Sequence, residues 1–284
     1  MKYCIIDIGS NSVRLATIKD GKTLYKKVII THLAENLGER RFLSNNAIFR
    51  TIEGIGSLFD LAKKEEPNSI NIFATAAVRL ANNGSDFCQI IKDKYGVEVD
   101  VVSGELEAKL GVMGAVDETA NAGLIDIGGA STEIVVLDGK DVYTNSFPVG
   151  ANTYTEILKD KNKSNYLNDI FVNLPKRDGY KFYGIGGTIL TAVAIKLGLK
   201  IYQPELVDGY KLNKIDVEKI KCELSRLTVE EIGKLDGVQK GREKVIFAGV
   251  KILSYLLEKL GLEEIIASEK DNLEGYYKYI LEKK

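Results

Sequence analysis

The sequence is poor in residues on which several kinds of enzyme depend: its 284 residues include one histidine, three cysteines and no tryptophan. A single histidine, His32, excludes most histidine-based metal sites and argues against a Ser-His-Asp triad. Cys4, Cys88 and Cys222 form no Cys-x-x-Cys pair, so we expect reduced, mostly buried thiols. Any metal ion should therefore be a hard ion held by oxygen atoms.

Long apolar runs and an excess of charge of either sign are also missing. The apolar runs are far shorter than the ~18 residues of a membrane span, so we expect none. The chain starts in a strand-like run without a cationic leader, which predicts a cytoplasmic protein. The formal net charge of −1 argues against a protein that binds nucleic acid through bulk charge. An anionic substrate would need a local group of donors.

A repeated stretch is the clearest feature that is present. The stretch "IIDIGSNSVR" occupies residues 5–14, and "LIDIGGASTE" occupies residues 124–133. A shift of 119 positions places Asp7, Gly9 and Ser12 on the equivalent residues of the second stretch. The chain also exceeds the usual size of one hydrophobic core. We therefore predict two related α/β domains, with a cleft between them as the expected site.

Hydrophobic periodicity predicts a β-hairpin after the start of each copy, followed by helices and further strands. The strands are expected at residues 3–8, 12–19, 23–31, 69–74, 97–102, 122–127, 131–137, 141–147, 180–185 and 263–267. Helices are expected at residues 44 to about 62, 85–95, 150–159, 164–172, 213–226, 241–260 and 272–282. Two more are expected, one that begins at residue 103 and one that ends at about residue 197.

The two repeated turns could bind phosphate. A tight turn rich in Gly and Ser gathers backbone N–H groups and hydroxyls at one point, which suits phosphate oxygens. The acids at the entrances, Asp7 and Asp126, would repel phosphate unless a hydrated Mg²⁺ lies between them and the substrate. A third glycine turn, Gly184 to Thr188, precedes a predicted helix. A single turn of this kind is more often a plain hairpin, but two matched copies and a third favour phosphate binding.

Two other stretches hold candidate catalytic side chains. In "VVSGELEAKL", Ser103 is typical of an N-cap, and Glu105 is explained as an acid in the first helical turn. Glu107 is not explained by a capping box and could be a general base that activates water. Arg79 is either a phosphate clamp or a surface ion-pair residue. Arg242 is expected to be solvated.

Taken together, the sequence resembles the exopolyphosphatase / guanosine pentaphosphate phosphohydrolase (Ppx/GppA) family. The matching stretches occur in the family's order as far as about residue 260: "DIGSNSVRL", "ATAAVRLANN", "VVSGELEAKLGVMGA", "DIGGASTE", "NSFPVGA", "GIGGT" and "REKVIFAGVKIL". The resemblance implies an α/β fold of two actin-like (ASKHA, ribonuclease H-like) domains with a duplicated core and an active-site cleft between the domains. The domains are expected at residues 1–117 and 118–284, and the last helix, about 270–284, could pack back on the first domain.

The resemblance also implies roles for individual residues. Glu107 falls on the family's catalytic glutamate, which is thought to orient or deprotonate the attacking water. The expected metal-side acids are Asp7, Asp126 and Glu133, with Mg²⁺ as the expected ion and other divalent ions as alternatives. The expected substrate-binding residues are Ser10, Asn11, Ser12, Arg79, Gly128, Gly129, Ser131, Gly186, Gly187 and Thr188.

Two stretches depart from the family pattern. Ala130 replaces the third glycine of the usual Gly-Gly-Gly-Ser turn, which matters if that position needs a positive φ. In "SEKDNLEG" (268–275), Asp271 and Leu273 replace the customary glycine and arginine. The resemblance also implies the short form of the family, for which we expect no helical domain like that of longer relatives.

The expected activity is the hydrolysis of terminal phosphoanhydride bonds of inorganic polyphosphate. Three alternatives are weighed: a guanosine pentaphosphate 5′-phosphohydrolase, a kinase of the same fold, and a catalytically weak regulator that binds polyphosphate or the alarmone. The kinase is disfavoured because neither an acceptor base nor an adenosine pocket is evident. Oligomeric state is left open, with a homodimer as one option.

Overall fold

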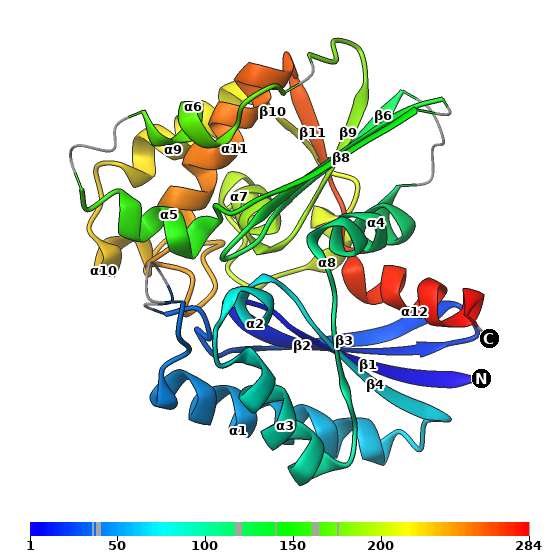
Figure 1. Ribbon diagram of the computed structural model, residues 1–284. Helices are drawn as coiled ribbons and strands as arrows, with labels where there is room; N and C mark the ends of the chain where they lie inside the picture. Colours follow the sequence, from blue (N-terminus) through cyan, green and yellow to red (C-terminus); the bar gives the residue numbers. More distant parts are fainter. Residues whose placement is uncertain are drawn as a thin grey trace. The chain divides into compact units, whose positions relative to one another are not determined.

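The computed structural model describes residues 1–35, 37, 41–116, 121–139, 141–160, 165–174 and 176–283. Its internal contacts divide the chain into two units (Figure 1). Unit 1 comprises Met1–Gly114 and Asn272–Lys284, and unit 2 comprises Ala115–Asp271. The predicted domain boundary, between residues 117 and 118, lies outside the described residues.

Unit 1 contains a five-stranded mixed sheet in the order β3-β2-β1-β4-β5. The strands are β1 (Lys2–Ile8), β2 (Ser12–Lys19), β3 (Lys22–Ile30), β4 (Ser69–Ala74) and β5 (Val99–Val101). β1 pairs antiparallel with β2, and β2 pairs antiparallel with β3. β1 pairs parallel with β4, and β4 pairs parallel with β5.

Helices cover both faces of this sheet (Figure 1). They are α1 (Asn45–Lys64), α2 (Ala76–Leu80), α3 (Gly84–Tyr95), α4 (Gly104–Ala115) and α12 (Asn272–Glu282). The side chain of Ser44 caps α1 by accepting a hydrogen bond from the amide of Ala47 at 3.2 Å. α12 packs on β1 and β2, where Leu273 and Tyr276 join a core with Ile5, Phe73 and Leu110.

Unit 2 repeats this plan with one additional strand. Its strands are β6 (Ala122–Ile127), β7 (Thr132–Asp138), β8 (Asp141–Phe147), β9 (Lys181–Ile185), β10 (Lys211–Asn213) and β11 (Glu264–Ala267), in the order β10-β11-β9-β6-β7-β8. The run β8-β7-β6-β9-β11 matches β3-β2-β1-β4-β5 in both order and direction. The duplicated core that the sequence predicts is therefore present.

The helices of unit 2 are α5 (Ala151–Ile157), α6 (Tyr166–Ile170), α7 (Gly187–Leu197), α8 (Pro204–Val207), α9 (Lys214–Leu224), α10 (Val229–Ile232) and α11 (Ile246–Leu260). The helix predicted from residue 241 begins only at Ile246. Gly241 has a φ of +92°, and the next residues form turns in which the amide of Val245 donates to the carbonyl of Arg242 at 3.0 Å. Arg242 therefore lies in a turn before α11.

The parallel strands of each sheet end at a common edge. In unit 1 the register pairs Ile8 with Ala74 and Ala74 with Val101. In unit 2 it pairs Asp126 with Ile185, and Gly184 with Ala267. The loops that follow these strands therefore gather at one edge of each sheet, where ligand-binding loops of α/β sheets are usually found.

The structure corrects one expectation about the cysteines. All three thiols are free, but only Cys4 is buried, while Cys88 is half-buried and Cys222 is exposed. Cys222 lies on α9 on the side away from the buried Val217 and Ile220, which explains its exposure. Burial raises the pKa of the Cys4 and Cys88 thiols. Within the described residues, none of the helices is both long and apolar enough to span a membrane.

Candidate functional site

Two tight turns of the same kind connect the first two strands of each sheet. In loop 1 (Gly9–Ser12), the amide of Gly9 donates to the carbonyl of Ser12 at 2.9 Å. In loop 2 (Gly128–Ser131), the amide of Gly128 donates to the carbonyl of Ser131 at 3.0 Å. This shared geometry fits an anion-binding nest in each unit. The phosphate-binding roles of Ser10, Asn11, Ser12, Gly128, Gly129 and Ser131 stay predictions.

The acids beside the two loops have different partners. Asp7 lies opposite Arg14 across β1 and β2, and Nε and Nη2 of Arg14 both donate to Oδ2 of Asp7, the former at 2.9 Å. At the equivalent positions of β6 and β7, Asp126 lies opposite Glu133, and both are buried. Oε1 of Glu133 accepts a hydrogen bond from Oγ of Ser146 at 2.7 Å. Because like charges opposite each other in a sheet repel, a cation that binds both carboxylates of the unit 2 pair would be stabilising.

A segment after β3 packs over loop 1. The amides of Thr31 and His32 both donate to the carbonyl of Asn11 at 3.0 Å, and the amide of Ala34 donates to the carbonyl of Ser10 at 2.8 Å. The side chains of His32 and Asn11 also bond, with 2.8 Å between Nδ1 and Oδ1. The only histidine of the chain therefore helps to hold a candidate phosphate loop, a role that no sequence pattern indicated.

The corresponding segment after β8 packs over loop 2. The amide of Ala151 donates to the carbonyl of Gly128, and that of Asn152 donates to the carbonyl of Gly129, both at 2.8 Å. Gly150 lies so close to the loop that a Cβ atom on it would be 2.5 Å from the carbonyl carbon of Gly129. The φ of Gly150 is −137°, so the close approach, and not the backbone conformation, requires glycine here.

We expect Gly150→Ala to lower the free energy of unfolding by about 1–3 kcal/mol, because the new methyl group overlaps backbone atoms of loop 2. Urea unfolding measures this change. Gly233→Ala is the matched control, since its Cβ would meet only ordinary contacts at 3.5 Å or more and its φ is −64°. Equal stability of both variants would contradict a tight contact at Gly150.

Ala130 does not strain loop 2. It is buried, and it is not among the described residues with a positive φ, so the position has no need of glycine. The equivalent position of loop 1 is Asn11, which also carries a side chain. The departure from the family's third glycine is therefore compatible with the same turn.

The third glycine turn lies next to loop 2. Gly186 has a φ of +84°, and a Cβ atom on it would be 2.6 Å from Oδ1 of Asp126. Gly187 begins α7, and its missing side chain leaves space for Arg242, whose Nη1 would lie 1.7 Å from a Cβ there. Oγ1 of Thr188 donates to the carbonyl of Ile127 at 3.4 Å. The structure thus brings Gly186, Gly187 and Thr188 together with Asp126.

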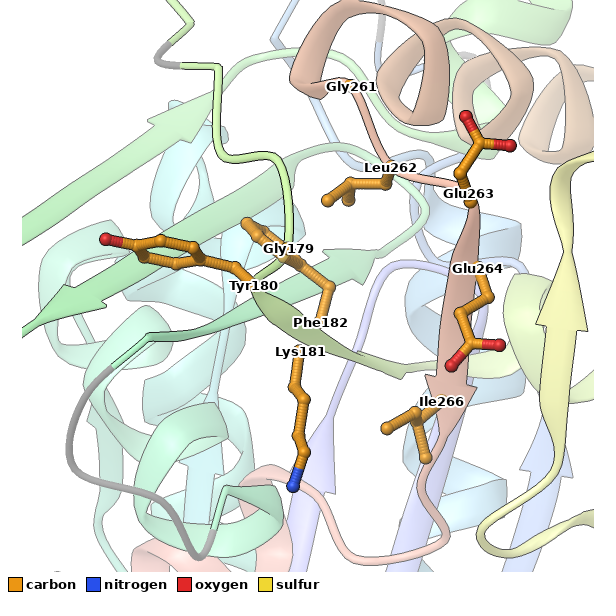
Figure 2. A pocket seen from close by; sticks show the side chains of 9 residues that line it. All are labelled: Gly179, Tyr180, Lys181, Phe182, Gly261, Leu262, Glu263, Glu264 and Ile266. Atoms are coloured by element: carbon orange, nitrogen blue, oxygen red, sulfur yellow. The ribbon is translucent and has the colours of Figure 1, made fainter.

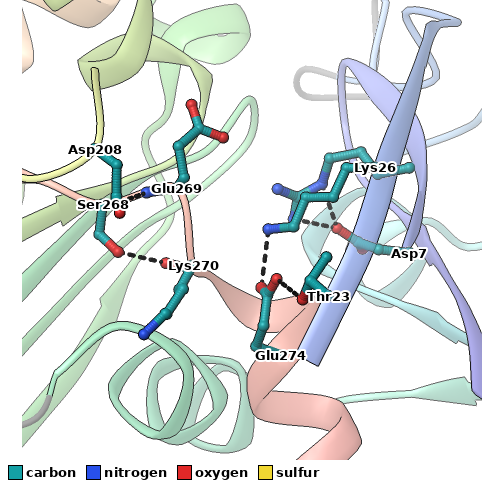
Figure 3. A network of polar contacts seen from close by, with 9 residues as sticks. Asp7, Thr23, Lys26, Asp208, Ser268, Glu269, Lys270 and Glu274 are labelled. Carbon is teal, nitrogen blue, oxygen red and sulfur yellow. Dashed lines mark hydrogen bonds and ion pairs between the residues drawn. The ribbon is translucent and has the colours of Figure 1, made fainter. Parts of the chain in front are cut away.

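Arg242 is a candidate that sequence reasoning missed, and its expected solvation is wrong. It is half-buried, and its guanidinium packs against the N-terminus of α7. Nearby, the hydroxyl of Tyr202 donates to Oε1 of Glu269, and burial, followed by the charge of Glu269, raises the pKa of Tyr202. The amide of Glu269 in turn donates to Oδ1 of Asp208 at 2.9 Å (Figure 3). The sequence feature that could have identified Arg242 is its place at the start of the family-matched stretch "REKVIFAGVKIL".

In unit 1, Glu107 lies in the first turn of α4 and is paired with Arg79. Nη1 of Arg79 donates to Oε2 of Glu107 and to the carbonyl of Val102, both at 2.8 Å. The side chain of Glu107 is 7% exposed and that of Arg79 is 21% exposed. Oγ of Ser103 accepts from the amide of Leu106 at 3.1 Å, as expected of an N-cap. Arg79 is therefore not a surface ion-pair residue, and it restrains the Glu107 carboxylate.

The divergent segment 268–275 is buried except at Glu269, which is half-buried, and Lys270, which is exposed. Leu273, in place of the family's arginine, is fully buried, and Asp271 is 4% exposed. Glu274 accepts hydrogen bonds from Oγ1 of Thr23 at 2.7 Å and from Nζ of Lys26 at 2.8 Å (Figure 3). Leu273 thus contributes packing within unit 1, where an arginine would have brought charge.

A pocket of about 280 Å³ lies at the opposite edge of the unit 2 sheet (Figure 2). Its lining comes from the beginnings of β9 and β11 and includes Tyr180, Lys181, Phe182, Glu263 and Glu264. Loop 2 and the third glycine turn follow the carboxyl ends of the parallel strands β6 and β9, at the other edge of the sheet, so this pocket is separate from them.

The candidate residues therefore gather within each unit. Unit 1 holds Asp7, near the end of β1, with loop 1, Arg79 and Glu107, which follow the ends of β1, β4 and β5. Unit 2 holds Asp126, near the end of β6, and Glu133, at the start of β7, with loop 2 and the third glycine turn at the ends of β6 and β9. Among the residues that the structure describes, no three His, Cys, Asp or Glu side chains form a group that could hold a metal ion by themselves.

Comparison with known proteins gives a consistent family match. A profile of the Ppx/GppA phosphatase family matches residues 15–283. The bifunctional 3-dehydroquinate synthase/phosphatase of Fusobacterium nucleatum subsp. nucleatum is 30% identical over 304 aligned positions. The alignment covers 95% of this chain and 45% of that protein, so the chain spans less than half the length of this curated relative.

Solved structures show the same fold. The PPX-GPPA enzyme of Aquifex aeolicus superposes with a TM-score of 0.78 at 29% identity, over 98% of both chains. An exopolyphosphatase of Cytophaga hutchinsonii superposes with a TM-score of 0.87 at 20% identity, over 100% of this chain and 98% of that one. The predicted class, an α/β fold with two actin-like domains, is confirmed.

Proposed function

The chain belongs to the Ppx/GppA phosphatase family, and from this premise we propose that it is an exopolyphosphatase. In this proposal it hydrolyses the terminal phosphoanhydride bond of inorganic polyphosphate and releases orthophosphate. The observation that carries the proposal is the ion pair of the buried Glu107 with Arg79, at the same sheet edge as a phosphate-type turn. Family membership supports phosphatase chemistry, and the residues suggest how the chain performs it.

Loops 1 and 2 would bind the phosphate groups of the substrate. Each offers a tight backbone turn with a serine hydroxyl, and each is fastened by a segment that donates amide hydrogens to its carbonyls. These bonds occupy carbonyl oxygens, which would otherwise repel an anion, and they hold the turn in one shape. Preorganised donors of this kind favour binding of a polyanion because little order is lost on binding.

Glu107 would orient the attacking water. Its carboxylate accepts a hydrogen bond from Arg79, and its other lone pairs can accept one from water. The water oxygen attacks the terminal phosphorus, the bond from that phosphorus to the bridging oxygen breaks, and the water's proton passes to Glu107. The shortened chain leaves with the bridging oxygen, and orthophosphate is the second product. Such catalysis rests on positioning and charge stabilisation.

Asp126 and Glu133 would hold a divalent cation, for which Mg²⁺ is the best candidate. Two buried carboxylates in register on neighbouring strands supply oxygen ligands and carry a repulsion that a cation removes. When bound, Mg²⁺ would neutralise phosphate oxygens and the charge that develops on them. Asp7 remains a weaker proposal, because Arg14 already balances its charge.

A substrate panel tests the proposed function. Phosphate release is measured with Mg²⁺ against polyphosphates of several chain lengths, guanosine pentaphosphate and ATP with a sugar acceptor. We expect the highest kcat/KM for polyphosphate. A higher kcat/KM for guanosine pentaphosphate would identify the alarmone as substrate, phosphate transfer to the sugar would indicate a kinase, and tight binding without turnover would indicate a regulator. Each of these three results would overturn the exopolyphosphatase assignment.

A further inference from the structure

Helix α12 makes an unusually close contact with α4, the helix that carries Glu107. A Cβ atom on Gly275 would lie 1.9 Å from the carbonyl oxygen of Leu110 and 2.6 Å from its carbonyl carbon. No side chain larger than hydrogen fits there without a shift of backbone atoms. Gly275 lies within a helix, so the close approach of the two backbones, and not a special φ, is what requires glycine.

Helix α12 is fixed on the sheet of unit 1 and cannot easily yield to such a clash. Glu274 bonds to Thr23 and Lys26 on β3. The ring of Tyr276 stacks on Phe73 with 4.5 Å between the centroids, and its hydroxyl donates to Oδ2 of Asp100 at 3.2 Å. Because close-packed cores transmit strain, a change at Gly275 should move α4 more than α12.

A second contact joins α12 to the end of α4. Nζ of Lys278 donates to the carbonyl of Met113, in the last turn of α4. A cation at this end also suits the helix dipole. Helix α4 is therefore held by α12 at Leu110 and at Met113, and Leu110 lies three residues, almost one turn, after Glu107.

We infer that Gly275 is a positioning residue for Glu107. By allowing α12 to pack directly on the backbone of α4, it determines where the first turn of α4 places the carboxylate. The inference deepens the proposed function and rests on it. Misplacement of a catalytic group by about 1 Å can cost ~10²-fold in rate, so a small shift of α4 is sufficient to be measured.

Gly275→Ala is the direct test. We expect kcat for phosphate release from polyphosphate to fall by roughly 10- to 100-fold, with KM within about twofold, because the phosphate loops are not part of this contact. Gly233→Ala, on a glycine with ordinary contacts, is the control that should keep wild-type kcat. Rates are divided by the folded fraction from urea unfolding, so that loss of stability alone does not lower the reported kcat.

A double-mutant cycle separates positioning from a general structural role. In a Glu107→Gln background, Gly275→Ala should lower the residual rate by less than about twofold, since the group it positions is already disabled. If Gly275→Ala lowers kcat by the same factor in the wild-type and the Glu107→Gln backgrounds, the inference is overturned. If Gly275→Ala does not fold, Lys278→Met decides in its place: a severalfold loss of kcat supports the inference, and wild-type kcat overturns it.

The two proposals fail in different ways. An active wild-type chain whose kcat is unchanged by Gly275→Ala overturns the positioning role alone. A wild-type chain that releases no phosphate from polyphosphate overturns the proposed function and the inference together.

Discussion

Glu107→Gln is expected to lower kcat for phosphate release from polyphosphate by about 10²–10⁴-fold, the usual contribution of a general base. Glutamine keeps the size of the side chain and can still accept a hydrogen bond from Arg79, which lies 2.8 Å from Oε2 in the wild type. It cannot accept the proton of the attacking water at neutral pH. Polyphosphate binding should therefore survive, and initial-rate kinetics together with a binding titration measure both quantities.

Glu105→Gln is the matched control for this experiment. Glu105 lies in the same first turn of α4 but is exposed, and the sequence explains it as an acid near a helix N-terminus. We expect its kcat to stay within about twofold of the wild type. Normal turnover in Glu107→Gln would exclude Glu107 as the base, and an equal loss in both variants would point to an effect on the helix instead.

Much of the fold could be predicted because the chain repeats itself. The matched "DIG" stretches identified two copies of a hairpin, and hydrophobic periodicity placed the other strands within a few residues, except the three-residue β10, which was missed. Once the order of one sheet is known, the repeat implies the same order for the other. The loops with glycine and serine could be found for the same reason, since a turn that appears twice in one chain is poorly explained as a plain hairpin.

The partners of the acids could not be predicted from the repeat. The register places Arg14 opposite Asp7 but Glu133 opposite Asp126, so one pair attracts and the other repels. Sequence reasoning treated Asp7 and Asp126 alike because it compared the turns and not the residues across the strands. A one-residue change of register would have separated both pairs, so only the structure shows the difference.

Arg242 was missed for a related reason. The helical apolar pattern after residue 245 favoured a helix that begins at residue 241, which would include Arg242. An arginine on the polar side of a helix is usually solvated. In the structure, Gly241 and the following turns delay the start of the helix to Ile246, and the guanidinium of Arg242 reaches the space left by Gly187. The space for Arg242 is left by Gly187, 55 positions earlier in the chain. Neither this distant contact nor the turn before α11 produces a pattern in the sequence around Arg242.

Removal of either acid of the unit 2 pair is expected to abolish the effect of Mg²⁺ on both activity and stability. Asp126→Asn and Glu133→Gln each leave one carboxylate, which loses most of the attraction for a divalent ion. We expect phosphate release at fixed Mg²⁺ to fall by roughly 10²-fold or more. In the wild type, Mg²⁺ that binds the native state should raise Tm, and we expect both variants to lose this rise.

Thermal unfolding with and without Mg²⁺ tests this assignment without reference to turnover. In EDTA, Glu133→Gln should unfold at the same or a higher temperature than the wild type, because it removes a like-charge repulsion on the sheet. The amide oxygen of the new glutamine can still accept the hydrogen bond from Ser146. Asp60→Asn, at an exposed position of α1, is the control that should keep the full Mg²⁺-dependent rise. If Glu133→Gln keeps that rise as well, the cation binds elsewhere, and the pair needs another explanation for its two buried charges.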